Sequence, residues 1–479
     1  MKETTKDSQN IRSKTDNEEK KWIPLCQRKS LNILRIYAIC ANQISTNFVW
    51  NPLSVLTAPM CRKLGLSHFS ISLILLIGPI SGFIIPPIVS GLSDTTTLKF
   101  GRRRIYLIIG EILVIIGLPM IGFCREISIY FNPLSFLNSN RSESSSNSTN
   151  IEATFYFVTG EILAYVGGNI INGPGRAMCT EVVPPSQKVL ATSFIALDSA
   201  ITSLVSNSIG AFKLYRYTSM TNETFVLIVS CFVGIIAMVV SVISTREEPL
   251  KVAPKSINPI TVMIDSVRSV DRNIVFILIS NFFYCFSYSQ FYGQGANYIA
   301  VKLFGGYPND PEGKYDAGIS YYQFLMLFLT CSQFFFSTIN TKIIKRIGFK
   351  TGWTIAMTFQ TVTNILLFVI DSKKYIFIPY LLAGFTTVMN NTVPLTYVSL
   401  NAPQDRIAGY VTLLILTNNV SVMLANLLLH MYLGSLPFFE EDPGRLIALG
   451  SVFSVMSLIT SRIGYGHKIK SKENKEKED

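Results

Sequence analysis

Hydrophobic runs long enough to cross a bilayer recur along nearly the whole chain, and no other feature restricts its fold as strongly. A helix needs about 20 mainly apolar residues to span the ~30 Å hydrocarbon core of a membrane. By this criterion the sequence contains about twelve such runs. They cover residues 31–59, 69–90, 105–124, 154–180, 189–212, 224–244, 273–298, 319–339, 351–370, 375–399, 408–433 and 444–463.

The composition agrees with this interpretation. Of the 479 residues, 49% are apolar and only 15% are charged. The charges concentrate in tails and short connections, as is typical of a membrane protein. The strands of a membrane β-barrel would give shorter, alternating segments. The sequence therefore predicts an all-α, polytopic membrane protein.

The composition changes near the middle of the chain, at residues 244–259, which divides the predicted helices into two sets of about six. A basic segment after the second run, at residues 102–104, recurs more weakly after the eighth run, at residues 339–353. This internal duplication predicts two six-helix bundles. The expected parts are a cytosolic tail (1–30), an N-terminal bundle (31–244), a cytosolic central loop (245–272), a C-terminal bundle (273–463) and a second cytosolic tail (464–479).

Basic residues predict the orientation, because they accumulate in cytosolic loops. They lie before the first run and after the second, sixth and eighth runs, on one side of the predicted topology; Arg62 and Lys63 are an exception on the other side. That other side also carries the predicted glycosylation sites Asn140, Asn147 and Asn222. The formal charge of +12 is then explained by topology and by an anionic lipid leaflet, without nucleic acid.

The sequence offers little for catalysis. Its eight cysteines lack metal-ligand or CxxC spacing, and it has only three histidines. No hydrolase triad, zinc-protease motif or phosphate-binding loop is found. We expect neither an enzyme nor a metal or other cofactor.

The fourth run carries a polar stripe. At about 100° per residue its members fall within an arc of about 80° on a helix. Because polar groups are costly against lipid, the stripe should face a cavity, or else a buried network between helices. The members are Glu161, Tyr165, Asn169, Asn172 and Arg176.

The first run has a matching set of amides beside an aromatic ring. Asn47 and Asn51 flank Trp50, and Asn42 and Gln43 precede them. Amides and a ring suit a neutral polyhydroxylated solute, although such residues can equally join helices to one another. Similar candidates in the second half are Asn390, Asn391, Asn418 and Asn419.

Two stretches carry a family resemblance. Residues 64–106 read LGLSHFSISLILLIGPISGFIIPPIVSGLSDTTTLKFGRRRIY, and residues 168–182 read GNIINGPGRAMCTEV. They resemble the plant sucrose/proton symporters and related animal solute-carrier sugar transporters, of the glycoside-pentoside-hexuronide type, in the major facilitator superfamily. The resemblance implies the superfamily fold and extends mainly over the first four predicted helices.

The resemblance also implies roles for single residues. Arg176 stands at the family's arginine for substrate and proton coupling, His68 at an outer-loop histidine linked to sugar access, and Trp50 at a tryptophan of helix one. The family's acid eleven residues before the arginine is Tyr165 here. Further acidic positions after helix seven correspond to Gly295 and Asn297, so the proton machinery departs from the family's pattern.

The sequence thus predicts a secondary transporter that moves a sucrose-like disaccharide or a hexose by alternating access. Proton coupling stays open, and a passive uniporter or a carrier of another small polar solute is the alternative. A non-transporting sugar sensor is the alternative of another class. The expected partners are the sugar, protons and the lipid bilayer, with no obligate protein partner. The expected location is the plasma membrane, or an internal membrane.

Two charge pairings are also expected. The loop after the second run should help to close the cytosolic face, unless it is only a positive-inside anchor. Its residues are Asp94, Arg102, Arg103 and Arg104, with Glu181, Glu247 and Glu248 as opposing charges.

Asp198 should replace the missing acid as the partner of Arg176, because a helical hairpin brings both to a similar depth. Its rivals are Glu161 and Glu111. His68 should modulate access without binding metal.

Overall fold

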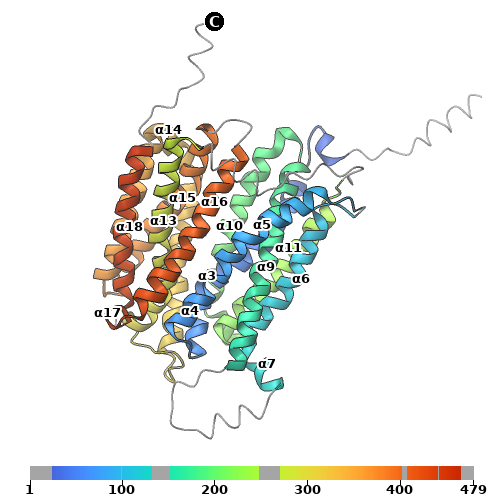
Figure 1. Ribbon diagram of the computed structural model, residues 1–479. Helices are drawn as coiled ribbons and strands as arrows, with labels where there is room; N and C mark the ends of the chain where they lie inside the picture. Colours follow the sequence, from blue (N-terminus) through green and yellow to red (C-terminus); the bar gives the residue numbers. More distant parts are fainter. Residues whose placement is uncertain are drawn as a thin grey trace, which may run out of the picture.

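The computed structural model describes residues 24–98, 100–131, 151–247, 270–401, 407–440 and 442–464. Figure 1 shows two bundles of long helices side by side. Within the described ranges all regular secondary structure is helical. The predicted all-α, polytopic fold in two bundles is confirmed.

The first bundle follows the predicted runs closely. α2 and α3 are separated only at Ala41, and α4 and α5 only at Leu75 and Leu76, so each pair accounts for one predicted run. α7 is a short additional helix. The helices are α2 (Ile33–Cys40), α3 (Asn42–Lys63), α4 (His68–Ile74), α5 (Ile77–Thr95), α6 (Arg104–Gly122), α7 (Cys124–Phe131), α9 (Ile151–Glu181), α10 (Lys188–Ala211) and α11 (Asn222–Ser244), with short 3-10 turns η1 (Leu25–Gln27), η2 (Pro185–Gln187) and η3 (Leu214–Tyr217).

The second bundle contains two π-helical turns, η4 and η5, which continue α13 and α16. The basic segment at 339–353 is helical rather than a loop. Two helices of α14 meet there at Gly348, whose φ of 77° favours glycine and turns the chain within one residue. The elements are α13 (Arg272–Tyr298), η4 (Ile299–Leu303), α14 (Lys314–Val369), α15 (Phe377–Asn401), α16 (Ile407–Ala425), η5 (Asn426–Tyr432), η6 (Leu433–Ser435), α17 (Pro437–Glu440) and α18 (Pro443–Gly464).

Eight helices within the described ranges are long and apolar enough to cross a membrane. The other predicted spans coincide with α3, α9, α10 and α15. These four helices carry polar residues in their middle turns, such as Asn47, Asn169, Asp198 and Asn390. Two of them, α3 and α9, supply most of the predicted site.

α6 and α9 pack closely through glycines. A Cβ built on Gly110 would lie 2.7 Å from the carbonyl oxygen of Gly167, and one on Gly167 would lie 2.6 Å from that of Gly110. Gly117 and Gly160 repeat the arrangement, at 2.8 and 2.9 Å. Small residues let helix backbones approach in this way inside membranes.

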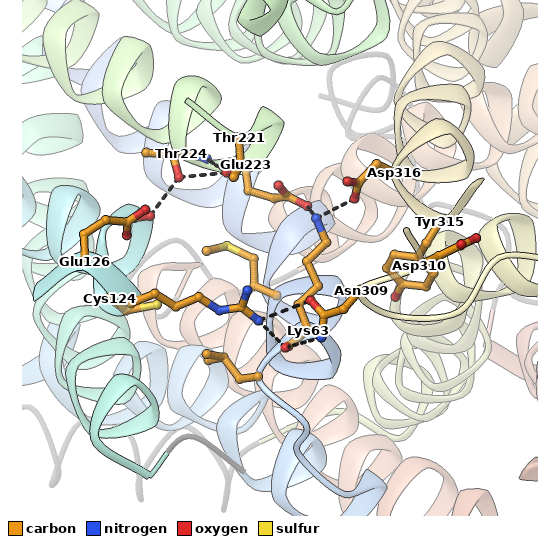
Figure 2. A pocket seen from close by; sticks show the side chains of 14 residues that line it. Lys63, Cys124, Glu126, Thr221, Glu223, Thr224, Asn309, Asp310, Tyr315 and Asp316 are labelled. Atoms are coloured by element: carbon orange, nitrogen blue, oxygen red, sulfur yellow. Dashed lines mark hydrogen bonds and ion pairs between the residues drawn. The ribbon is translucent and has the colours of Figure 1, made fainter. Parts of the chain in front are cut away.

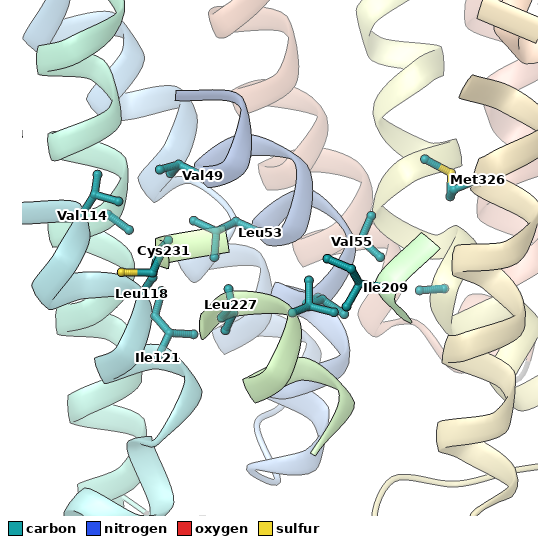
Figure 3. Packing of buried hydrophobic residues seen from close by; sticks show 14 of the residues in the cluster. Val49, Leu53, Val55, Val114, Leu118, Ile121, Ile209, Leu227, Cys231 and Met326 are labelled. Atoms are coloured by element: carbon teal, nitrogen blue, oxygen red, sulfur yellow. The ribbon is translucent and has the colours of Figure 1, made fainter. Parts of the chain in front are cut away.

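The apolar core joins several helices of the first bundle and extends into the second. Figure 3 shows Leu53 of α3, Leu118 of α6 and Leu227 of α11 in one cluster, with Met326 of α14 at its edge. The halves are therefore in apolar as well as polar contact.

Two ends of the molecule are used as landmarks below. α3 ends, and α11 and α14 begin, at the end that we call the Lys63 face. α5, α9 and α11 end at the opposite end, which we call the Arg102 face. The predicted cytosolic side corresponds to the Arg102 face, and this sidedness stays a prediction. Residues 1–23, most of the central loop and residues 465–479 lie outside the described ranges.

Candidate functional site

The polar stripe of α9 lies against α3 and α5, inside the first bundle. Glu161 is fully buried and accepts a hydrogen bond from the Thr57 hydroxyl of α3, at 2.5 Å. Asn169 donates to the Ser81 hydroxyl of α5, at 2.9 Å. The stripe therefore points away from lipid, as its composition requires.

A chain of hydrogen bonds connects Arg176 of α9 to α3. Arg176 Nε donates to Gln43 Oε1 of α3 at 3.3 Å, and the Gln43 amide donates to Asn42 Oδ1 at 2.8 Å. Gly175 allows this approach, because a Cβ there would lie 2.3 Å from Asn42 Oδ1. The Arg176 side chain is nevertheless exposed, so part of the guanidinium is accessible to a solute.

The two aromatic residues predicted for the site contact each other. The rings of Trp50 and Tyr165 have centroids 5.3 Å apart, and both side chains are half-buried. The Tyr165 ring also lies against Gly78 of α5, where a Cβ would come within 2.9 Å. An aromatic surface thus stands within the polar stripe.

Some amides of α3 and α9 lack hydrogen-bond partners. Among the described residues, Asn51 Nδ2 and Asn172 Oδ1 are buried atoms without a partner, and Asn47 is half-buried. Buried polar atoms are normally paired. These orphan groups are therefore available to hydrogen-bond a polar solute.

The site reaches the boundary between the bundles. The amide nitrogen of Asn419 on α16 lies 3.3 Å from the place of a Cβ on Gly82 of α5, and Asn169 Oδ1 lies 3.7 Å from the same point. Asn419 is therefore next to the α9 stripe. Asn418 instead accepts from Asn281 within the second bundle, and Asn390 and Asn391 are half-buried and exposed.

The second bundle contributes a row of tyrosines that the sequence analysis missed. The rings of Tyr284 and Tyr288 on α13 have centroids 5.5 Å apart, and those of Tyr288 and Tyr292 are 4.2 Å apart. Tyr288 and Tyr292 are half-buried, and α13 packs against α3. Their spacing of four residues was a visible signal, because it places them on one helix face.

The predicted ion pair between Asp198 and Arg176 is not formed. Asp198 is fully buried and faces the Tyr37 hydroxyl of α2, while Arg176 is directed to α3. The helical hairpin is less symmetric than expected. Arg176 is five residues from the end of α9, whereas Asp198 is ten residues into α10, which separates their depths by about 7 Å at 1.5 Å per residue.

The two rivals of Asp198 also lie inside the first bundle. Glu111 of α6 accepts from the Ser45 hydroxyl of α3 at 2.5 Å. Its second oxygen and the second oxygen of Glu161 are buried without a hydrogen-bond partner among the described residues.

The Arg102–Arg104 loop pairs with the expected acids. Arg103 is buried and contacts Glu181 at 2.7 Å, and Arg102 contacts the same carboxylate at 2.6 Å. Glu247 accepts from the backbone N–H of Arg103 at 3.0 Å. Glu181 belongs to α9 and Glu247 to the start of the central loop, so these contacts tie the loop to α9 and to the segment that follows α11. Glu248 lies outside the described residues, and the side chain of Asp94 is not described.

Burial and charge oppose each other at this loop. Burial raises the pKa of Glu181, but hydrogen bonds from Arg103 and the charges of Arg103 and Arg102 outweigh it, so the pKa is lowered below its ordinary value of 4.5. Burial raises the pKa of Glu247, despite the N–H groups of Arg103 and Arg104.

The remaining predicted residues lie at the Lys63 face. His68 begins α4, and its Nε2 lies 3.5 Å from Arg62 Nη1. The predicted glycan on Asn222 does not fit this structure. The Asn222 amide is buried and donates to Gln323 of α14 at 2.9 Å, which leaves no room for a sugar chain. Asn140 and Asn147 lie outside the described ranges.

Two bundles of membrane-spanning helices, with polar and aromatic side chains directed between the helices, define an integral multi-pass membrane protein. The model of the Major Facilitator Superfamily matches residues 38–426. The chain therefore belongs to this superfamily, which confirms the resemblance seen in the sequence.

Curated relatives include plant sucrose transport proteins. The chain is 30% identical to sucrose transport protein SUC3 of Arabidopsis thaliana over 183 residues, which are 38% of this chain and 30% of that protein. It is 24% identical to sucrose transport protein SUT5 of Oryza sativa subsp. indica over 345 residues, 68% of this chain and 64% of that one. The matched segments thus span less than two thirds of these relatives.

Solved structures share the fold at low identity. A mutant of the nucleoside transporter NupG aligns with a TM-score of 0.65 and 12% identity, covering 91% of this chain and all 100% of that one. An auto-inhibited POT family peptide transporter aligns with a TM-score of 0.62 and 12% identity, covering 91% and 97%. These similarities establish the architecture only.

Proposed function

We propose that this protein carries a neutral sugar, a sucrose-like disaccharide or a hexose, across a membrane by alternating access. One observation supports the proposal most strongly. The α9 stripe contacts α3 through the Trp50–Tyr165 pair, and Asn51 of α3 and Asn172 of α9 carry buried amide atoms without partners among the described residues. Rings contact the apolar face of a sugar, while amides and a guanidinium hydrogen-bond its hydroxyls. The curated relatives named as sucrose transport proteins support the same substrate class.

The arrangement of contacts between the halves supports alternating access. Hydrogen bonds and ion pairs between described residues of the two bundles gather toward the Lys63 face, as in Asn222 with Gln323 and Lys63 with Asp316. The Arg102 face has its described charge pairs within the first bundle. Two rigid bundles that separate at one face and close at the other would expose the stripe alternately.

The test is uptake of labelled sucrose, maltose and glucose into vesicles that contain the purified protein. We expect saturable uptake of at least one sugar, and a loss of about tenfold or more in Arg176→Gln, because a charged hydrogen-bonding group of the stripe is removed. Arg216→Gln is the matched control, since Arg216 is exposed on η3 outside the stripe. Absence of uptake of all three sugars by folded protein would reject the proposal.

We propose Asp198 as the proton-coupling acid, with Glu161 as the rival. Position 165 is a tyrosine, and Asp198 is a fully buried carboxyl that faces the Tyr37 hydroxyl. Charging such a group is costly unless a counter-charge approaches, so its protonation can follow the state of the transporter. Coupling predicts faster uptake with an inward proton gradient.

The prediction for this coupling is that Asp198→Asn removes the dependence of uptake on the pH gradient, while Glu161→Gln retains it. The measurement is initial uptake with and without the gradient, at matched protein amounts. The reverse pattern would transfer the role to Glu161. If the wild-type protein ignores the gradient, it is a passive uniporter and neither residue couples protons.

A further inference from the structure

Lys63 lies between carboxylates from the two bundles. Its Nζ is 2.6 Å from Glu223 of α11, in its own bundle, and 2.5 Å from Asp316 of α14, in the other. Figure 2 shows the lysine between these two acids. The Glu223 side chain is only 3% exposed, whereas that of Asp316 is 50% exposed. One acid is therefore fixed inside its bundle, and the other can leave into water.

A second set of contacts crosses the same boundary. The carbonyl of Lys63 accepts from the Asn309 amide at 2.9 Å and also from Arg125 of α7. Asn309 belongs to the connection between η4 and α14 and has a φ of 64°, a left-handed conformation that asparagine tolerates better than most residues. The connection thus places its amide on the end of α3.

A small cavity surrounds these contacts. Its volume is about 200 Å³, and its lining comes from both bundles. Binding sites for small molecules are usually about 300–1,000 Å³, so the cavity has room for water but not for a disaccharide. Polar members of the lining include Lys63, Arg125, Glu126, Glu223, Asp310 and Asp316.

We propose that the Lys63–Asp316 ion pair is a latch that closes the Lys63 face, and that the cavity around it is the contracted mouth of the transport path. The inference rests on the proposed alternating access. When the bundles part, Asp316 moves away with α14, and Glu223 continues to neutralise Lys63. Lys63 therefore never becomes an unpaired buried charge, which keeps both states accessible.

The experiment measures the distance between the bundles at this face by pulsed electron paramagnetic resonance. Spin labels replace Tyr130 on α7 and Tyr432 on η5, which are 81% and 72% exposed. Cys26 and Cys331, the free cysteines that are not buried in the described structure, are changed to serine. We expect Asp316→Asn to increase the population with the longer distance about two- to fivefold, the range for removing a partly exposed ion pair.

Glu312→Gln is the matched control. Glu312 pairs at 2.5 Å with Lys314 of its own bundle, so its loss should leave the distances unchanged. Lys63→Gln provides a second variant, which should shift the distances in the same direction as Asp316→Asn. Unchanged distances in both folded variants would overturn the latch. Because no sugar is needed, a shift in distances without sugar uptake would reject the proposed substrate and retain the latch.

Discussion

At the residue scale, the contacts of single side chains fix the basic loop at residues 102–104 to the rest of the first bundle. Arg103 shows this most clearly. Its side chain is 5% exposed and donates to Glu181 and to the Ser93 hydroxyl, at 2.7 and 2.5 Å. Arg104 instead lies 4.4 Å above the Phe100 ring at the surface. Adjacent arginines of one basic motif therefore make different contacts: Arg103 forms buried hydrogen bonds, and Arg104 packs on an aromatic ring.

The first prediction separates these contacts. Arg103→Gln should destabilise the protein by on the order of 1–3 kcal/mol, because Ser93 and Glu181 lose a charged donor. Arg104→Gln should cost less, about 0.5–1 kcal/mol, since it loses a cation–π contact with Phe100 and one hydrogen bond to the Phe100 carbonyl but no carboxylate partner of its side chain. Thermal unfolding in detergent measures both. Equal losses would show that the loop acts only through its total charge.

Glu181 gives a prediction for pH. Its pKa is lowered in the folded protein by Arg103 and Arg102, although burial acts in the opposite direction. A group with a lowered pKa contributes its full stability above its ordinary value of 4.5, and the contribution is lost as the pH falls through the lowered value. The difference in melting temperature between wild type and Glu181→Gln should be constant near neutral pH and should shrink as the pH falls below 4.5. A difference that grows on acidification would contradict this sign.

At the element scale, helix spacing is set by the smallest residues. The four glycines between α6 and α9 are spaced by seven residues on each helix, at positions 110 and 117 and positions 160 and 167. A seven-residue spacing returns to the same helix face after two turns. The backbone contact also holds the α9 stripe at a fixed distance from the rest of the bundle.

The prediction at this scale is that Gly117→Ala destabilises the protein by about 1–3 kcal/mol, because the added methyl overlaps the α9 backbone. Gly122→Ala, on the same helix, is the control. Its Cβ would meet Thr224 at 3.4 Å, which is an ordinary contact. Thermal unfolding of both variants measures the loss of stability. A larger loss for Gly122→Ala than for Gly117→Ala would refute the role of the glycine contact.

At the scale of the whole molecule, a transporter needs two arrangements of similar free energy, so contacts between its halves must be strong enough to close a face and weak enough to release it. Lys63 meets this requirement. Burial lowers its pKa, but Glu223 and Asp316 outweigh burial and raise the pKa above 10.5.

The resulting prediction concerns alkaline pH. A raised lysine pKa means that the contribution of Lys63 is fully present below 10.5 and is lost only as the pH rises through the raised value. The distance between Tyr130 and Tyr432 labels should therefore stay constant from neutral pH to about pH 9.5. Opening of the Lys63 face within that range would mean that another group controls the latch.

Much of the architecture could be predicted from the sequence because bilayer thickness fixes the length of an apolar run. The run at 224–244 became α11, Asn222–Ser244, nearly to the residue. The polar stripe could also be predicted, since helical periodicity alone places Glu161 and Arg176 on one face of α9. Charges at 102–104 indicated a loop, and Glu181 proved to be its partner.

Other features depended on the tertiary structure, because they depend on side-chain direction and on which helices become neighbours. The sequence suggested a similar depth for Asp198 and Arg176, but the folded hairpin separates their depths, and the one side chain faces Tyr37 while the other is directed to Gln43. The sequence marked Lys63 only as an exception to the charge rule. The structure explains why a lysine stands at this position. Folding brings Glu223 and Asp316, from helices far apart in the chain, to the same ammonium group.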